Sequence, residues 1–177
     1  ADDVQPAYSP DGKQIAFVSS RSSATKLRYD GYDLPLMGGD IWVIPALGGN
    51  ARKVAEGGNF PSWSRDGSAL LFTAGPAFQQ KIYRVDAQGG EPREIVPRLD
   101  TGAGVPRFLL HPRYSADERW IVFEADSPSV LGMRDIWVVR TDNGEVQHIA
   151  KGQYPSWNGD AIIYSSAEAG KEFSLWQ

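Results

Sequence analysis

The sequence predicts an all-β protein built from four similar units, and three observations support this prediction. A motif in which an aromatic residue follows a proline by two positions, just before a turn, occurs as PAYSPDG (6–12), PSWSRDG (61–67), PRYSADE (112–118) and PSWNGDA (155–161). Short β-branched and aromatic segments alternate with 19 glycines and 12 prolines, which is typical of strands joined by tight turns. No segment has a convincing helical period of apolar residues.

Each unit contains the expected strands in the same order. In the first unit, the proline motif gives the first strand and an Asp-Gly turn, and the apolar segment 14–19 gives the second strand. Segments 40–45 and 51–56 give the third and fourth strands, joined by a glycine-rich turn. The corresponding segments of the later units are 69–74, 120–125 and 161–166 for the second strand, 81–86, 135–140 and 174–177 for the third, and 92–97 and 146–151 for the fourth.

The spacing of the units predicts a β-propeller of four-stranded antiparallel blades. The motif prolines are separated by 55, 51 and 43 residues, and a propeller blade repeats about every 40–45 residues. We expect one partial propeller over residues 1–177, with repeat units at approximately 5–58, 59–110, 111–153 and 154–177, the last incomplete. Since propellers usually have about 4–8 blades, we expect a fragment of a larger ring, in which open blade edges favour self-association.

The repeated residues are expected to serve the architecture. The motif aromatics are large enough to fill the space between packed blades; they are Tyr8, Trp63, Tyr114 and Trp157. Asp11 and Asp66 each follow a serine by two positions, and such side chains usually hydrogen-bond the turn backbone. A residue that every blade needs is a poor candidate for a unique activity, so function is expected in the segments that do not repeat.

These residues resemble the WD40-like PD40 repeat of TolB-like β-propellers. The resemblance lies in PAYSPDGKQIAFVSSR (6–21) with DIWVIPALGG (40–49), and in PSWSRDGSALLFT (61–73) with KIYRVDAQGG (81–90). The third unit departs at Asp117 and Glu118, where the turn glycine is absent, and the fourth unit has a shorter turn around Gly159. The resemblance is specific for the fold and carries little information about function.

Two functions are compatible with the resemblance. The first is a non-catalytic scaffold that binds a protein or peptide, which by resemblance would be periplasmic or extracellular, although a cytoplasmic location stays open. The second is the substrate-gating propeller portion of a larger prolyl-oligopeptidase-like serine peptidase or other hydrolase. Such a portion would be inactive alone, because the catalytic residues of that family lie in a separate domain.

Composition excludes several other classes of function. The net charge is −4 with an isoelectric point near 5.2, which argues against nucleic acid as a partner, since that needs a basic surface. The chain has no cysteine, so disulfides, thiolate metal sites and a cysteine nucleophile are excluded. No apolar run approaches the roughly 18 residues of a membrane-spanning helix, and membrane insertion is therefore not expected.

Long connections are expected to gather at one end of the blades. Residues 21–39 and 126–134 connect second to third strands, and residues 97–111 connect a fourth strand to a first strand. We call these three segments the loop face, because such connections lie at the same end of an up-and-down blade. Loops on a rigid scaffold often carry binding sites, and Tyr and Arg are enriched in binding hot spots. The candidate binding residues are Arg21, Lys26, Arg28, Tyr29, Tyr32, Asp33, Arg107, Phe108 and Arg134. The alternative is that these loops are solvated and their aromatic residues pack on blade edges.

Signals for catalysis and metal binding are weak. The sequence has no Gly-x-Ser-x-Gly, no His-Glu-x-x-His and no phosphate-binding glycine loop, so we expect no catalytic residues. His111 and His148 are interpreted as surface or edge histidines. No cofactor is expected, although the oxygens of Glu124 and Asp126 are weak candidates for Ca²⁺ because hard carboxylate ligands suit that ion. The spacing of Glu124 and Asp126 is not that of a dedicated calcium loop.

Overall fold

The structure, a computed structural model, describes residues 2–22, 39–96, 99–102, 104–127 and 133–166, and the backbone alone at 28–29, 35–37 and 174–176. All regular elements in these ranges are strands, which confirms the all-β prediction. Within the described ranges, no helix is long and apolar enough to cross a membrane.

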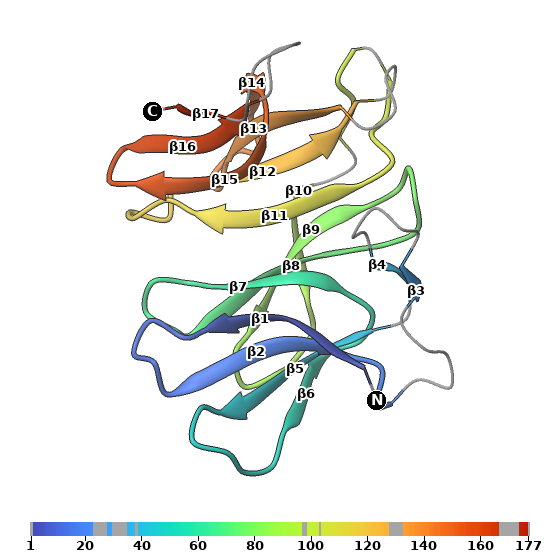
Figure 1. Cartoon of the computed structure of the whole chain (residues 1–177), viewed down its shortest axis with the longest axis vertical. Helices are drawn as coiled ribbons and strands as arrows, with labels where there is room; N and C mark the ends of the chain where they lie inside the picture. Colours follow the sequence, from blue (N-terminus) through green and yellow to red (C-terminus); the bar gives the residue numbers. More distant parts are fainter. Residues whose placement is uncertain are drawn as a thin grey trace.

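Apart from one two-stranded pair, the strands form a series of antiparallel sheets, each a blade (Figure 1). The first blade contains β1 (Asp3–Tyr8), β2 (Gln14–Ser19), β5 (Asp40–Pro45) and β6 (Arg52–Ala55). The second contains β7 (Asn59–Trp63), β8 (Ala69–Ala74), β9 (Lys81–Asp86) and β10 (Arg93–Val96). The third contains β11 (Leu109–Tyr114), β12 (Trp120–Asp126), β13 (Arg134–Arg140) and β14 (Val146–Lys151). The fourth has three strands, β15 (Gln153–Asn158), β16 (Ala161–Ser166) and β17 (Ser174–Trp176), and a separate pair joins β3 (Arg28–Tyr29) to β4 (Pro35–Met37).

Apolar side chains fill the space between successive blades. Phe72 of β8 packs with Val18 and Ile41 of the first blade, and Phe123 of β12 packs with Leu71 of the second. Between the third and fourth blades, Val122, Ile136 and Val138 contact Trp157, Ile162 and Tyr164. Each blade therefore buries one face against its neighbour, as the strand pattern predicts.

The motif aromatics join one blade to the preceding one. Trp63 Nε1 donates a hydrogen bond to the Ala7 carbonyl at 2.9 Å, and Trp157 Nε1 donates to the Arg113 carbonyl at 3.1 Å. Tyr8, the first of the four, is 66% exposed, because the described chain has no blade before β1. The exposure of this position thus depends on whether a neighbouring blade is present.

The first strand of every blade contains a β-bulge that the sequence did not predict. The residue before each motif proline has a left-handed backbone; these residues are Gln5, Phe60, His111 and Tyr154, with φ of 54°, 54°, 50° and 54°. The strand register shifts at the same places. A residue before proline normally favours an extended backbone, and a bulge is a common means of redirecting a side chain. The bulges place four side chains at equivalent positions on β1, β7, β11 and β15.

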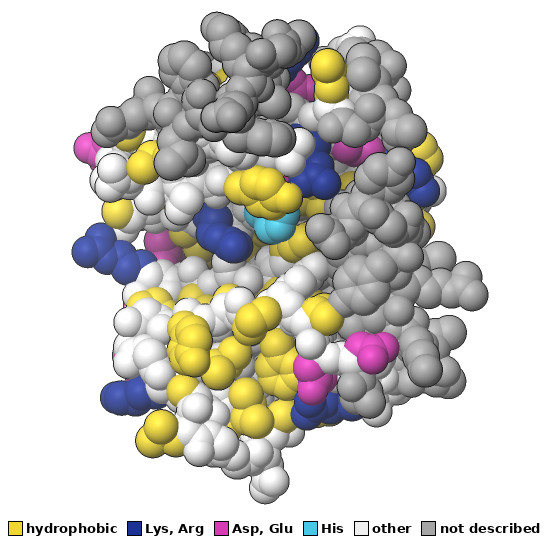
Figure 2. All heavy atoms as spheres, viewed as in Figure 1, with side chains coloured by type: hydrophobic (Ala, Val, Ile, Leu, Met, Phe, Trp, Pro, Cys, Tyr) yellow, Lys and Arg dark blue, Asp and Glu magenta, His cyan; other side chains and the backbone are white. Residues whose placement is uncertain are grey.

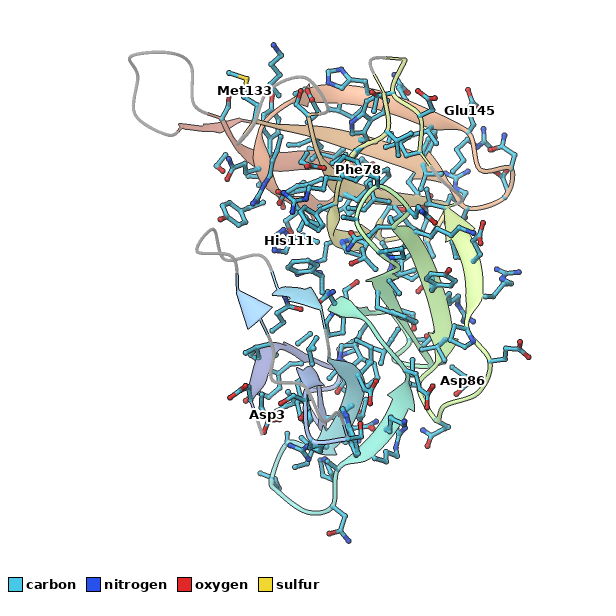
Figure 3. All side chains as sticks on the ribbon, turned by 90° about the vertical axis from the view of Figure 1, so that its right-hand side faces the viewer. Asp3, Phe78, Asp86, His111, Met133 and Glu145 are labelled. Carbon is cyan, nitrogen blue, oxygen red and sulfur yellow. The ribbon has the colours of Figure 1, made fainter. Side chains whose placement is uncertain are left out.

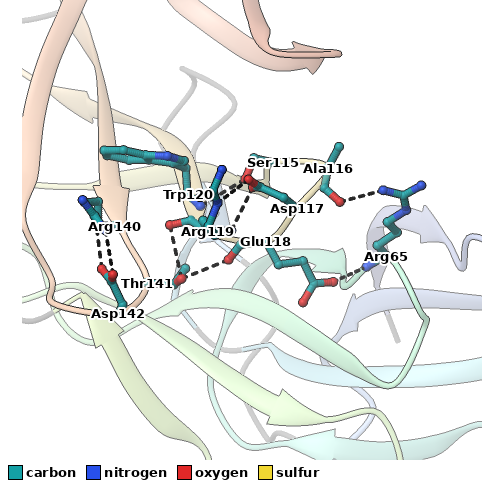
Figure 4. Close-up of polar contacts among 10 residues, drawn as sticks. All are labelled: Arg65, Ser115, Ala116, Asp117, Glu118, Arg119, Trp120, Arg140, Thr141 and Asp142. Carbon is teal, nitrogen blue, oxygen red and sulfur yellow. Dashed lines mark hydrogen bonds and ion pairs between the residues drawn. The ribbon is translucent and has the colours of Figure 1, made fainter.

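The turn of the third blade replaces glycine with a residue that connects two blades. Gly12 and Gly67 have φ of 70° and 72°, and Glu118 occupies the equivalent position with φ of 57°. The Glu118 carboxylate accepts a hydrogen bond from the Arg65 N–H at 2.7 Å, and Arg65 Nη1 donates to the Ala116 carbonyl at 2.8 Å (Figure 4). A left-handed backbone is unfavourable for residues other than glycine, so this contact offsets local strain.

We expect Glu118→Ala to lower the free energy of unfolding by about 1 kcal/mol, because it removes the inter-blade hydrogen bond and keeps the strained backbone. Glu118→Gly should lie closer to wild type, because glycine adopts this backbone without a steric penalty. Urea denaturation of the three proteins measures both differences. A glycine variant that is less stable than the alanine variant would contradict the proposed strain.

Candidate binding site on the loop face

The structure describes only some of the loop-face residues predicted from the sequence. Lys26, Tyr32 and Asp33 lie outside the described residues, and only the backbone of Arg28 and Tyr29 is described, as β3. For these positions, a role in binding stays a prediction. Arg21, Arg107, Phe108 and Arg134 are described with their side chains.

Arg21 is held against its own blade. Its Nη2 atom contacts both carboxylate oxygens of Asp3, at 3.0 and 2.9 Å, and its Nε atom donates to Ser19 Oγ at 3.0 Å. Its guanidinium carbon also lies 5.0 Å from the Phe17 ring centre and 5.1 Å from the Trp42 ring centre. Cation–π contacts of this kind fix the side chain, so Arg21 covers the outer face of the first blade.

Phe108 is buried. It is 4% exposed and packs with Phe60 and Leu110, while the guanidinium of Arg107 lies 4.9 Å from the centre of its ring. Its placement agrees with the alternative interpretation that the aromatic residues of these loops pack on the blades. Arg107 remains next to it at the loop face.

Arg134 belongs to a charged group that brings together residues from different strands. We call Phe60, His111, Glu124, Arg134 and Tyr154 the axial cluster. The Glu124 side chain is fully buried, and its Oε2 atom accepts a hydrogen bond from Arg134 Nη1 at 3.0 Å. Its Oε1 atom contacts His111 Nδ1 at 2.7 Å and accepts from the Tyr154 N–H at 2.6 Å. One carboxylate therefore connects β11, β12, β13 and β15.

The charges in the axial cluster favour an ionised Glu124. Burial raises the pKa of its carboxyl, but the hydrogen bonds from His111 and Tyr154 and the charge of Arg134 hold the pKa below its ordinary value. An ionised carboxylate only accepts hydrogen bonds, so the proton lies on His111 Nδ1. The Nε2 atom of His111 is then the ring nitrogen left for another contact.

Aromatic rings enclose His111 on two sides. The Phe60 ring meets it edge-on with centres 4.5 Å apart, and the Tyr154 ring is tilted with centres 5.5 Å apart. Tyr154 is 58% exposed. Figure 3 shows His111 on the inner side of the curve that the blades form. The cluster thus presents an oriented imidazole and an exposed phenol, both attached to strands.

Glu124 interrupts the repeat pattern. The equivalent residues of β2, β8 and β16 are Val18, Thr73 and Ser165, as the pairing with the first strands shows. Ser165 Oγ donates to the Gln153 carbonyl within its own blade at 3.1 Å. Aligning the second strands of the units would have revealed an acidic residue at a position that is otherwise apolar or hydroxylated. This signal was in the sequence and was missed.

The structure gives Glu124 and Asp126 different partners. Both carboxylate oxygens of Glu124 already take part in hydrogen bonds. A cation bound there would lie next to the positive charge of Arg134. Asp126 Oδ1 accepts from the Phe108 N–H at 2.6 Å, and burial raises the pKa of its carboxyl above the ordinary value. Among the described residues, no three His, Asp or Glu side chains are grouped to hold a metal ion. His111, interpreted as a surface or edge histidine, instead pairs with a buried carboxylate.

Sequence comparisons relate the chain to longer proteins. No family model matches the sequence. An uncharacterized protein of Agrobacterium fabrum is 31% identical over 139 residues, which cover 73% of this chain and 43% of that protein. Tricorn protease homolog 1 of Streptomyces coelicolor is 27% identical over 179 residues, or 93% of this chain and 15% of that protein. The chain thus spans less than half the length of each of these relatives.

Comparison with solved structures identifies the fold. TolB of Acinetobacter baumannii superimposes with a TM-score of 0.70 at 22% identity, over 98% of this chain and 40% of that chain. A putative TolB of Agrobacterium tumefaciens gives 0.68 at 23% identity, over 94% and 55%. The β-propeller domain of the Trilobed protease of Pyrococcus furiosus gives 0.62 at 15% identity, over 99% and 54%. The chain is therefore a partial β-propeller with the fold shared by TolB and by the propeller domains of peptidases.

Proposed function

We propose that this chain is part of a non-catalytic, TolB-like propeller scaffold that binds a protein or peptide through its loop face. The observation that carries this proposal is the axial cluster, in which the buried, non-repeating Glu124 orients His111, Arg134 and the backbone of Tyr154. Buried charges are costly unless they are paired, and here they fix side chains at the inner edge of the loop face. We also propose a periplasmic or extracellular location, which the likeness to TolB supports.

The cluster has the physical properties of a binding hot spot. Tyr154 offers a large ring at small cost in conformational entropy, and tyrosine and arginine dominate the energetics of many interfaces. Its backbone N–H donates a hydrogen bond to Glu124, and its ring centre lies 5.5 Å from that of His111. Side chains that are ordered before binding lose less entropy when a partner arrives.

The second candidate is the substrate-gating propeller portion of a larger peptidase. The match to the Streptomyces coelicolor tricorn protease homolog covers 93% of this chain, and an uncharacterized peptidase of Bacillus subtilis is 24% identical over 155 residues. In this case the loop face would admit peptides to catalytic residues elsewhere in the parent protein. A Gly-x-Ser-x-Gly motif in the adjoining coding sequence would favour the peptidase, and further PD40 repeats alone would favour the scaffold.

We expect Tyr154→Ala to weaken peptide binding about tenfold, because it truncates an exposed aromatic anchor. Peptides selected from a random phage-displayed library on the wild-type protein would be titrated by fluorescence anisotropy. Tyr8→Ala is the matched control, because Tyr8 is similarly exposed, at 66% against 58%, but lies at the opposite end of its strand. An equal loss in both variants, or no enriched peptide, would contradict binding at the loop face.

A further inference from the structure

At its seam with the fourth blade, the third blade carries charged residues at two positions where the other blades have none. The inner part of this seam contains Arg113, Glu124 and Arg134, all within the third blade. At the position of Arg113, the first and second blades have Ala7 and Ser62, as the strand pairing shows. The fourth blade has Ser156 at this position. Among the described first strands, the third blade thus differs from the others in carrying an arginine at this position.

Arg113 is charged and without an acidic partner in the described part of the chain. Its Nη1 atom donates to the Pro112 carbonyl at 3.0 Å, and its carbonyl accepts from Trp157 Nε1. Burial lowers the pKa of Arg113, while the Glu124 carboxylate raises it. A guanidinium stays protonated in proteins, so Arg113 contributes a positive charge next to Glu124.

The charges at this seam do not balance. Glu124 carries one negative charge and already pairs with Arg134, which leaves the charge of Arg113 uncompensated. Each guanidinium has five N–H donors, and the described residues supply one acceptor to Arg113 and one to Arg134. Figure 2 shows Lys or Arg side chains on both sides of a histidine near the middle of the view, below a hydrophobic side chain. The seam is therefore suited to an anion.

We propose that the axial cluster, together with Arg113, recognises a carboxylate on the bound peptide. This inference rests on the proposed function and specifies its ligand chemistry. A guanidinium and a carboxylate form short, charge-assisted hydrogen bonds with matched planar geometry. The aromatic rings of Phe60 and Tyr154 would reduce the access of water and strengthen the contact. The carboxylate can belong to the C-terminus of the peptide or to an acidic side chain.

Four short peptides of equal length, labelled with an uncharged dye and identical apart from the changes named next, test this proposal by fluorescence anisotropy. The first has a free C-terminal carboxylate, the second is its amide, and the other two are amides with a central glutamate or glutamine. We expect a peptide with the recognised carboxylate to bind about tenfold tighter than its neutral counterpart. Preference for the free C-terminus, for glutamate or for both identifies the source of the carboxylate.

Variants of Arg113 test whether its side chain recognises the peptide carboxylate. Arg113→Gln should abolish the preference for carboxylate, and Arg113→Lys should retain part of it, because lysine keeps the charge without the planar fork. Arg119→Gln is the control, because Arg119 is an exposed arginine at the short-turn end whose side chain pairs with Asp117. Circular dichroism checks that each variant is folded. If Arg113→Gln does not fold, the affinities of the wild-type protein for the peptides with and without a carboxylate still decide whether a carboxylate is recognised.

Failure of this inference can be told apart from failure of the proposed function. Equal affinity for all four peptides, with weaker binding to Tyr154→Ala, would overturn carboxylate recognition and leave peptide binding at the loop face in place. A carboxylate preference that persists in Arg113→Gln would also overturn the inference. Absence of binding by all four peptides at millimolar concentration would overturn both proposals.

Discussion

Glu124→Gln is expected to lower the free energy of unfolding by about 3 kcal/mol, because it leaves Arg134 as an uncompensated charge in a buried site. The Glu124 side chain is fully buried, and the Arg134 side chain is only 14% exposed. The substitution also weakens the contacts to His111 and to the Tyr154 N–H, which attach the fourth blade to the third. Loss of stability should therefore be accompanied by loosening of the fourth blade.

Urea denaturation measures the change in stability, and hydrogen exchange at β15 and β16 reports on the fourth blade. Glu91→Gln is the matched control, because it makes the same chemical change at an exposed residue. If Glu124→Gln and Glu91→Gln have equal stability, the buried network contributes nothing to the fold. Faster exchange throughout the chain, without preference for the fourth blade, would argue against a local role.

The stabilisation from Glu124 should depend on pH. Its pKa in the folded protein lies below the ordinary value of 4.5. The ionised form is therefore favoured by folding, and its contribution is present above about pH 4.5 and disappears as the pH falls through the folded-state pKa. The stability difference between wild type and Glu124→Gln should be largest near neutral pH and shrink below pH 4.5. A constant difference over this range would contradict the network.

Phe72→Ala is expected to lower the free energy of unfolding by about 4 kcal/mol, because it opens a cavity between the first and second blades. Phe72 is 1% exposed, and its ring stacks on Tyr83 with centres 5.6 Å apart. A Cβ atom placed on Gly58 would lie 2.6 Å from the Phe72 ring, so the backbone already approaches the ring closely. Sheets on both sides of the ring limit how far the cavity can collapse.

Thermal and urea denaturation test this effect, with Phe78→Ala as the control. Phe78 is 54% exposed, so its truncation should change stability by less than about 1 kcal/mol. A small effect of Phe72→Ala, similar to that of Phe78→Ala, would mean that the two blades repack around the missing ring.

The sequence predicted the strands and turns well because their signals are local. Alternation of apolar residues defines a strand over a few residues. The turns require a positive φ, which Gly12 and Gly67 adopt without a steric penalty. The bulges were not predictable in this way. Gln5, Phe60 and His111 share a left-handed backbone but have no chemistry in common, and proline at the next position predicts an extended conformation.

The axial cluster depends on tertiary structure and could be recognised from the sequence only in part. His111, Glu124 and Arg134 lie in three different strands, and Tyr154 comes from the next blade. From the sequence, Glu124 is a weak candidate for a calcium ligand and Arg134 a candidate binding residue. Their pairing with each other could not be predicted, because spacing along the chain does not give the distance between strands.

The bulge before each motif proline has a consequence for how such a propeller can change over time. Backbone geometry at Gln5, Phe60, His111 and Tyr154 is nearly the same, although the side chains are an amide, a phenyl ring, an imidazole and a phenol. The position therefore accepts diverse substitutions while the scaffold stays constant. The side chain at this position can differ from blade to blade without a change in the backbone that carries it.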